Sequence, residues 1–139
     1  MKKDRLIAKK SLGQNFINDE NFLQKLSSLI VTDNNSLIIE IGPGKGALTK
    51  ELIKKEIEQI LVIEKDDRLI DNLKTFSKEF KNFKIIHQDA LKIDYNKIIK
   101  KNSIIVGNLP FNISSNLLMN WISLNKWPPL YRKMYLMFQ

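Results

Sequence analysis

Three glycines stand between an apolar run at residues 36–41 and a helical pattern, in the stretch "EIGPGKGALT". Only glycine readily permits the tight turn and the close backbone approach that a ligand-binding loop in this position needs. With Ala47 as its last position, the loop also fits the dinucleotide-binding pattern G-x-G-x-x-G/A. A nicotinamide dehydrogenase is therefore one candidate function, and a glycine-rich turn that holds no ligand is another.

Glu40, two residues before Gly42, argues against a dinucleotide. Its carboxylate would face the pyrophosphate that such a loop cradles, and two negative charges at that range repel strongly in a semi-buried cleft. The same carboxylate suits a cationic ligand. S-adenosylmethionine carries an ammonium and a sulfonium group and no phosphate, so we expect this cofactor beside Gly42 and Gly44.

Two further acids end apolar runs later in the chain. Glu64 follows "QILVI", eighteen residues beyond Gly46, where a carboxylate can accept both hydroxyls of an adenosine ribose. Asp89 follows "FKIIHQ", where it can accept from the exocyclic amine of the cofactor's adenine. Each has a structural alternative: Glu64 as an N-cap or first-turn acid of the next helix, and Asp89 as a cap for "ALKID".

The stretch "SIIVGNLPFNISS" ends a fourth apolar run in an amide, a leucine, a proline and a phenylalanine. An adenine or cytosine amine is a poor nucleophile, so an enzyme that methylates it must hold the amine with acceptors that favour a tetrahedral nitrogen. The side chain of Asn108 is one such acceptor and the carbonyl of Leu109, oriented by Pro110, is another. Phe111 offers a ring on which the extruded base can stack. The alternatives are a turn role for Asn108 and a core role for Phe111.

These residues sit at the ends of short β-branched runs, at 36–41, 59–64, 83–88, 103–108 and 134–138, that alternate with helical patterns. The alternation predicts an α/β fold: a Rossmann-like, doubly wound, mostly parallel sheet in which ligands bind at the carboxyl ends of the strands. A helix is expected over 19–31, with Asn18 or Asp19 as its N-cap. The fifth strand is expected at the outer edge of the sheet, close to the end of the chain.

The chain has 139 residues and a formal net charge of +8, which is typical of a protein with a polyanionic partner. The cations gather in an N-terminal arm, "MKKDRLIAKK", and in the clusters "LKIDYNKIIKK" and "KWPPLYRK". Without cysteine, and with His87 as the lone histidine, a metal centre is not expected. No apolar stretch matches a membrane span or a secretory signal, so we expect a cytoplasmic protein.

Five motifs, in this order, resemble those of the ribosomal RNA adenine dimethyltransferases: "SLGQNFI", "EIGPGKGALT", "VIE", "HQDAL" and "GNLPFNIS". The last has "NLPF" where the family usually has "NLPY". The resemblance implies S-adenosylmethionine-dependent dimethylation of N6 of two adjacent adenosines near the 3′ end of small-subunit rRNA, in ribosome biogenesis. It also implies that the cofactor pocket is completed by Gln14, Asn15, the backbone at Ile17, Gly42, Glu64, Asp89 and Asn108.

The resemblance also sets an expectation for domain organisation. Residues 1–139 correspond to an incomplete catalytic domain, since family members continue through two more strands and a small helical domain that grips RNA. We therefore expect a monomeric full-length protein acting on small-subunit rRNA or a pre-ribosomal subunit, and limited activity from this chain alone. Three alternatives stay open: a large-subunit rRNA methyltransferase of the antibiotic-resistance type, a noncatalytic RNA-binding relative, and the dehydrogenase.

Overall fold

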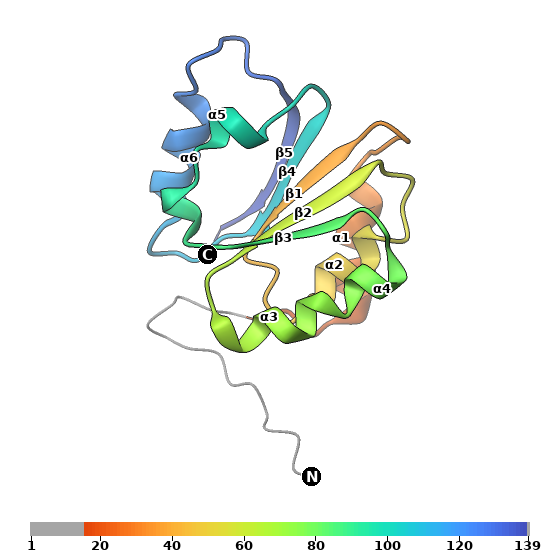
Figure 1. Cartoon of the computed structure of the whole chain (residues 1–139). Coiled ribbons are helices and arrows are strands. Elements are labelled where there is room, and N and C mark those ends of the chain that lie inside the picture. Colours follow the sequence, from red (N-terminus) through yellow and green to blue (C-terminus); the bar gives the residue numbers. More distant parts are fainter. Residues whose placement is uncertain (1–15, 139) are drawn as a thin grey trace.

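The computed structural model describes residues 16–138, which form one parallel sheet with helices on both faces (Figure 1). The strand order is β3-β2-β1-β4-β5, and every neighbouring pair is parallel. This confirms the predicted α/β class. The strands are β1 (Leu37–Ile41), β2 (Gln59–Glu64), β3 (Phe83–His87), β4 (Ser103–Asn108) and β5 (Tyr131–Met137).

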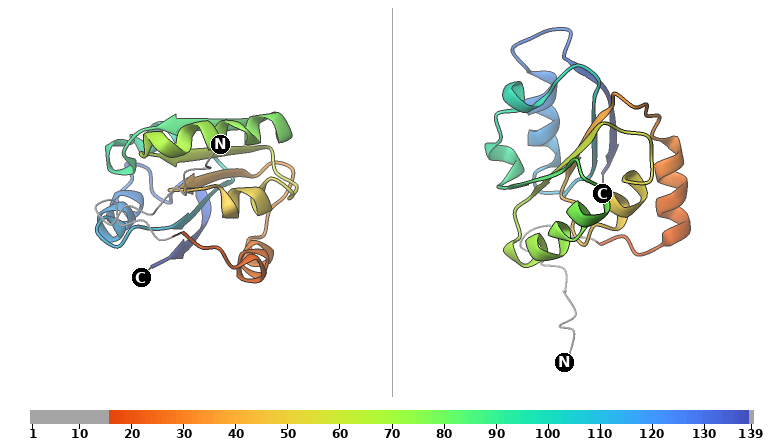
Figure 2. Two further views of the ribbon diagram at one scale, coloured as in Figure 1. Left: turned by 90° about the horizontal axis from the view of Figure 1, so that it is seen from below. Right: turned by 45° about the vertical axis from the view of Figure 1, so that its right-hand side comes forward.

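The helices divide between the two faces of the sheet, as the end-on view in Figure 2 shows. One face packs against α1 (Glu20–Leu29), α2 (Ala47–Leu52), α3 (Asp67–Lys74) and α4 (Phe76–Glu79). The other packs against the 3₁₀ turn η2 (Ala90–Lys92), α5 (Tyr95–Ile98) and α6 (Ser114–Ile122). The sheet is therefore doubly wound.

Coverage on both faces explains why the strands read as continuous apolar runs. In β1, Ile38 belongs to the core under α1–α4, whereas Ile39 belongs to the core under α5 and α6. In β2, Ile60 and Leu61 divide in the same way. Successive side chains of a strand point to opposite faces, so a strand buried on both needs apolar residues at every position. Glu40, in the middle of this pattern, is the exception that requires an explanation.

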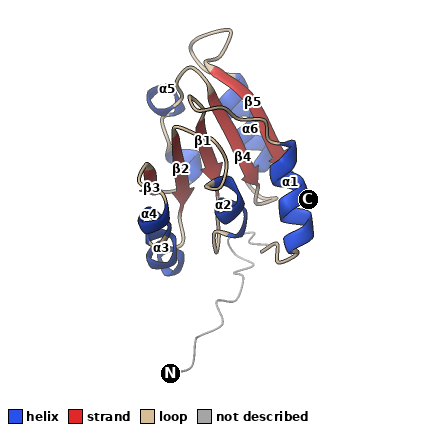
Figure 3. Cartoon of the chain, turned by 90° about the vertical axis from the view of Figure 1, so that its right-hand side faces the viewer, coloured by secondary structure: helices blue, strands red, loops and turns tan. Residues whose placement is uncertain are grey.

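The chain changes direction across the sheet at β1, which pairs with β2 on one side and with β4 on the other (Figure 3). Connections that leave a strand in opposite directions open a crevice outside the carboxyl ends of the two diverging strands. That crevice lies beside the glycine loop after β1 and the Asn108 stretch after β4. The topology thus brings together motifs more than sixty residues apart in the sequence.

Several local predictions can be compared with the structure. Asp19 is the N-cap of α1, since its side chain accepts from the backbone N–H of Phe22 at 3.0 Å. The fifth strand lies at the sheet edge as predicted, but it begins at Tyr131 rather than at residue 134, because Tyr131 already pairs with Ser103 of β4. His87 is the last residue of β3 and lies 2.8 Å from Asp67.

Within residues 16–138, no helix has the length and hydropathy of a membrane span. The same residues contain no group of three His, Cys, Asp or Glu side chains with the geometry of a metal site.

Candidate functional site

A cavity of about 150 Å³ lies at the carboxyl ends of β1, β2 and β4. Among the residues that line it are six of the predicted cofactor-binding positions: Ile17, Gly42, Gly44, Glu64, Asp89 and Asn108. Gln14 and Asn15, the other two predicted positions, lie outside the described residues. The sequence motifs therefore converge on one cavity, although their contacts with a ligand remain predictions.

The three glycines of the loop have different roles. All adopt left-handed backbone angles, with φ between +60° and +80°, which other residues rarely tolerate. A Cβ on Gly42 would meet nothing within 4 Å, so the backbone there faces open space in the cavity. A Cβ on Gly46 would lie 2.3 Å from the ring of Phe76, so this glycine allows the loop to pack against α4.

Glu64 lines the same cavity from its position at the end of β2. One carboxylate oxygen accepts from the backbone N–H of Gly44 at 3.1 Å, and the other accepts from Lys65 and Asp66 at 2.8 and 2.9 Å. The carboxylate thus ties the glycine loop to the turn after β2. The alternative role as a helix cap is wrong for Glu64, because the N-cap of α3 is Asp66.

Glu40 is a buried carboxylate, only 2% exposed, that reaches the same cavity from β1. It accepts a hydrogen bond of 2.7 Å from the hydroxyl of Thr49, which is itself fully buried on α2. Burial raises the pKa of Glu40 to about 7, and the nearby carboxylate of Glu64 adds to the increase while the Thr49 bond opposes it. Burial likewise raises the pKa of Glu64, whereas its three backbone hydrogen bonds lower it.

Asp89 has two partners in this structure. It is the N-cap of η2, accepting from the N–H of Leu91 at 3.0 Å, so the structural alternative for this residue is confirmed. Its second oxygen lies 2.7 Å from the ammonium of Lys65, which holds the pKa of Asp89 below its usual value. The carboxylate also lines the cavity, so a contact with an adenine amine would be added to these two.

The Asn108–Phe111 stretch lies where β4 ends. Asn108 and Pro110 line the cavity, whereas the side chain of Leu109 is buried in the core under α5 and α6. The N–H of Leu109 donates to the carbonyl of Met137 at 3.1 Å, which anchors the stretch to β5. Phe111 is 62% exposed, so the alternative that it is a core aromatic is wrong.

The sequence did not point to three residues of the site: Phe16 and Lys65, which line the cavity, and Thr49, which donates to Glu40. Thr49 could have been noticed as a polar residue on the buried face of a helix nine positions after Glu40. Lys65 carries no signal, because a lysine after a strand is ordinary in a chain with 23 cations. Phe16 packs 3.0 Å from the position of a Cβ on Gly44, with the ammonium of Lys45 5.0 Å from its ring centroid.

Comparison with protein families shows to which family the chain belongs. Residues 5–139 match the family model for ribosomal RNA adenine dimethylases. The chain belongs to the ribosomal RNA adenine dimethylase family. Membership agrees with the resemblance drawn from the five motifs and leaves no support for the dehydrogenase alternative.

Curated relatives of this dimethylase-family chain carry the name ribosomal RNA small subunit methyltransferase A. The protein of Bradyrhizobium diazoefficiens is 41% identical over 136 residues, and that of Bartonella tribocorum is 42% identical over 138 residues. In both cases the match covers 96% of this chain. The chain spans about half the length of these relatives, at 48% and 50%.

Solved structures show the same fold. A dimethyladenosine transferase from Plasmodium falciparum superposes with a TM-score of 0.76 at 27% identity, over 90% of this chain and 43% of that one. The 23S rRNA methyltransferase ErmE superposes with a TM-score of 0.70 at 22% identity, over 86% of this chain and 47% of that one. The five-stranded unit of the dimethylase-family chain is thus the Rossmann-like fold of rRNA methyltransferases.

Proposed function

We propose that this chain is the cofactor-binding part of an enzyme that uses S-adenosylmethionine to dimethylate N6 of two adjacent adenosines near the 3′ end of small-subunit rRNA. The observation that carries the proposal is the cavity itself. Two buried carboxylates, Glu40 and Glu64, line it together with Asn108, at the crevice of a methyltransferase fold. The names of the curated relatives support the small subunit as the substrate.

The cavity fits S-adenosylmethionine better than it fits a dinucleotide. The open side of Gly42 lets a ligand approach the backbone. In their ionised forms the two acids would supply negative charge for a sulfonium and an ammonium, in a cavity that Lys45 and Lys65 also line. Phosphates would be repelled by the same carboxylates. Glu64 would hold the ribose hydroxyls and Asp89 the adenine amine, while the cofactor supplies an activated methyl group.

The target base would be held at the other side of the cavity. Asn108 and the carbonyl of Leu109 would accept hydrogen bonds from the two N–H groups of the N6 amine as the nitrogen becomes tetrahedral in the first transfer. Each transfer would form a C–N bond as the methyl–sulfur bond breaks, leaving S-adenosylhomocysteine, and the nitrogen would release one proton to solvent. The exposed ring of Phe111, just outside the cavity lining, would stack on the extruded adenine. The chain would then work on rRNA or a pre-ribosomal subunit in the cytoplasm.

A single-turnover assay tests this function. The chain, in excess over RNA, is mixed with S-adenosylmethionine carrying an isotopically labelled methyl group and a 3′-terminal small-subunit rRNA fragment. Label on N6 of adenosine, lost in Asn108→Ala, is the expected result. Labelling of a large-subunit fragment in preference would instead favour the resistance-type activity. Binding of both ligands without any label in the RNA would contradict methyl transfer by this chain.

A further inference from the structure

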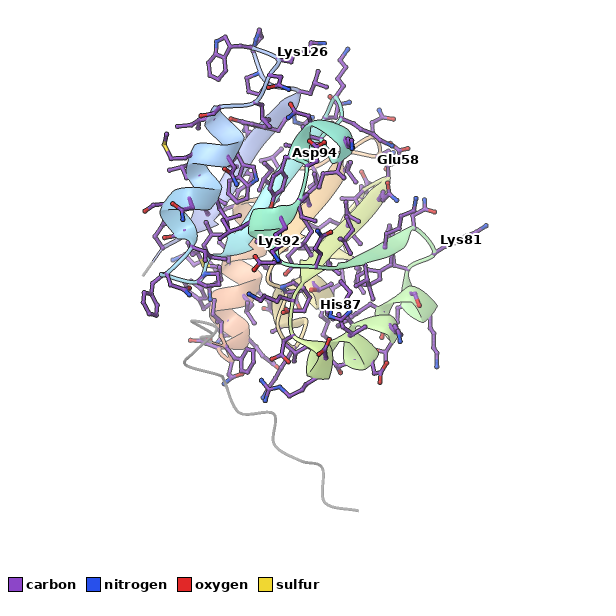
Figure 4. All side chains as sticks on the ribbon, turned by 60° about the vertical axis from the view of Figure 1, so that its left-hand side comes forward. Glu58, Lys81, His87, Lys92, Asp94 and Lys126 are labelled. Carbon is purple, nitrogen blue, oxygen red and sulfur yellow. The ribbon has the colours of Figure 1, made fainter. Side chains whose placement is uncertain are left out.

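The end of the molecule opposite the cavity carries four lysines around an exposed tryptophan. We name this set, Lys97, Lys100, Lys101, Lys126 and Trp127, the lysine–tryptophan patch. All five side chains are exposed, and Trp127 is 72% exposed, the most of the large apolar side chains in residues 16–138. Figure 4 shows Lys126 at this end of the molecule, with Asp94 close to the same end.

Two separate segments, residues 94–102 and 123–130, form the patch, and two contacts hold them together. The backbone N–H of Asn125 donates to the side chain of Asn96 at 3.2 Å. Ser103 pairs with Tyr131, which places the turn before β4 beside the turn before β5. Figures 1 and 2 both show these two turns at the same end of the sheet.

The turn that carries Lys100 and Lys101 is itself fixed. The N–H of Lys100 donates to the hydroxyl of Ser103 at 2.8 Å, and the N–H of Ser103 donates to the carbonyl of Lys100 at 3.0 Å. Asn102 completes the turn in a left-handed conformation, with φ of 70°. The lysines therefore project from an ordered backbone, which lowers the entropy lost on binding.

The local charge favours a phosphate backbone over a protein as the partner. These two segments hold four lysines and one acid, Asp94, whereas the whole chain has 23 cations and 15 acids. Asp94 already lies 3.4 Å from Lys97. Lysine is depleted from the cores of protein–protein interfaces, whereas an aromatic ring among cations is the usual platform for single-stranded nucleic acid.

From these observations we infer that the lysine–tryptophan patch is a second RNA-contact surface, in which the lysines bind phosphates and Trp127 stacks on an unpaired base. It lies one strand length, about 20 Å, from the cavity. One RNA could therefore contact both ends of the sheet. The inference rests on the proposed function at one point, namely that the substrate of the cavity is RNA.

Tryptophan fluorescence tests the inference directly, because the other tryptophan, Trp121, is fully buried. Quenching by acrylamide then reports chiefly on Trp127. The probe is a single-stranded oligouridylate, which contains no adenine for the cavity. We expect the oligonucleotide to protect Trp127 from acrylamide and Trp127→Ala to weaken its binding about tenfold. Trp127→Phe, which keeps a stacking ring, should recover most of that loss.

The lysines are tested by the dependence of binding on salt. Lys100→Gln combined with Lys101→Gln should reduce the slope of log affinity against log salt by roughly 1 to 1.5. The matched control is Lys78→Gln with Lys81→Gln, two exposed lysines on and after α4, and Phe22→Ala serves as the control for an exposed aromatic ring. Both control variants should bind the oligonucleotide with nearly the same affinity as the parent chain.

Three outcomes would overturn the inference: no protection of Trp127 by RNA, equal effects from patch and control variants, or binding of ribosomal proteins through Trp127 without binding of RNA. Calorimetry with S-adenosylmethionine on the same variants separates this inference from the proposed function. If the parent chain binds the cofactor and the patch variants bind RNA as well as the parent does, only the inference about the patch is refuted. If the parent chain does not bind S-adenosylmethionine, the proposed function of the cavity is refuted instead.

Discussion

Replacing Glu40 by glutamine should make the stability of the ligand-free chain less dependent on pH. The pKa of Glu40 is raised from its ordinary 4.5 to about 7, chiefly by burial. Between these two values the folded chain binds more protons than the unfolded chain, so the free energy of unfolding falls as pH rises from about 4.5 to 7. Each pKa unit corresponds to about 1.4 kcal/mol, so the shift from 4.5 to about 7 gives an upper limit of about 3.5 kcal/mol.

Glu40→Gln isolates this effect, because the amide keeps an oxygen for the 2.7 Å bond from Thr49 and cannot ionise. Urea unfolding followed by circular dichroism at pH 5, 6, 7 and 8 measures it. The variant should be more stable than the parent by less than about 1 kcal/mol at pH 5 and by up to about 3.5 kcal/mol at pH 8. A difference that does not change between pH 5 and pH 8 would refute the reasoning.

The same carboxylate should favour a cation once it is ionised. The carboxylate of Glu64 and the hydroxyl of Thr49 both act on the ionisation of Glu40, and Lys45 and Lys65 line the cavity beside it. The affinity for S-adenosylmethionine should therefore rise between pH 6 and 8 in the parent chain. In Glu40→Gln this affinity should depend less on pH. The affinity for S-adenosylhomocysteine, which lacks the sulfonium charge, should depend less on pH in both chains.

Three further predictions concern single residues. Glu64→Ala should weaken cofactor binding about tenfold to a hundredfold by calorimetry, since hydrogen bonds to a charged group contribute about 1.5 to 3 kcal/mol; equal affinity would refute the ribose assignment. Gly46→Ala should destabilise the fold by about 1 to 3 kcal/mol in urea, because a Cβ would overlap the ring of Phe76, and an unchanged midpoint would contradict that packing. Asn108→Ala should depress methyl transfer far more than RNA affinity, and a parallel loss of both would reduce Asn108 to a binding residue.

Much of the fold follows from the sequence because the three central strands, β1, β2 and β4, are buried on both faces and read as nearly continuous apolar runs. The predicted start of β5 was wrong because the first residues of this strand are polar and break the apolar pattern. Residues 131–133, "YRK", are polar, yet Arg132 forms an ion pair of 2.8 Å with Asp33 and extends the strand at the open edge of the sheet. Such a long-range partner leaves no local signal.

The candidate site was predictable where a backbone constraint is visible in the sequence. Glycines mark the loop after β1, and Pro110 marks the turn after β4. The contacts that hold the acids were not predictable, because they depend on which elements meet in space. Thr49 lies against Glu40 only because α2 packs on β1, and Lys65 meets Asp89 only because β2 and β3 end side by side.

Isothermal calorimetry of this chain with S-adenosylmethionine and with NAD tests the central claim most directly. The cavity lined by Glu40, Gly42 and Glu64 should bind the cationic cofactor with one site per chain, and NAD, with its pyrophosphate, should give no measurable heat. Binding of NAD in preference to S-adenosylmethionine, or binding of neither, would contradict the account.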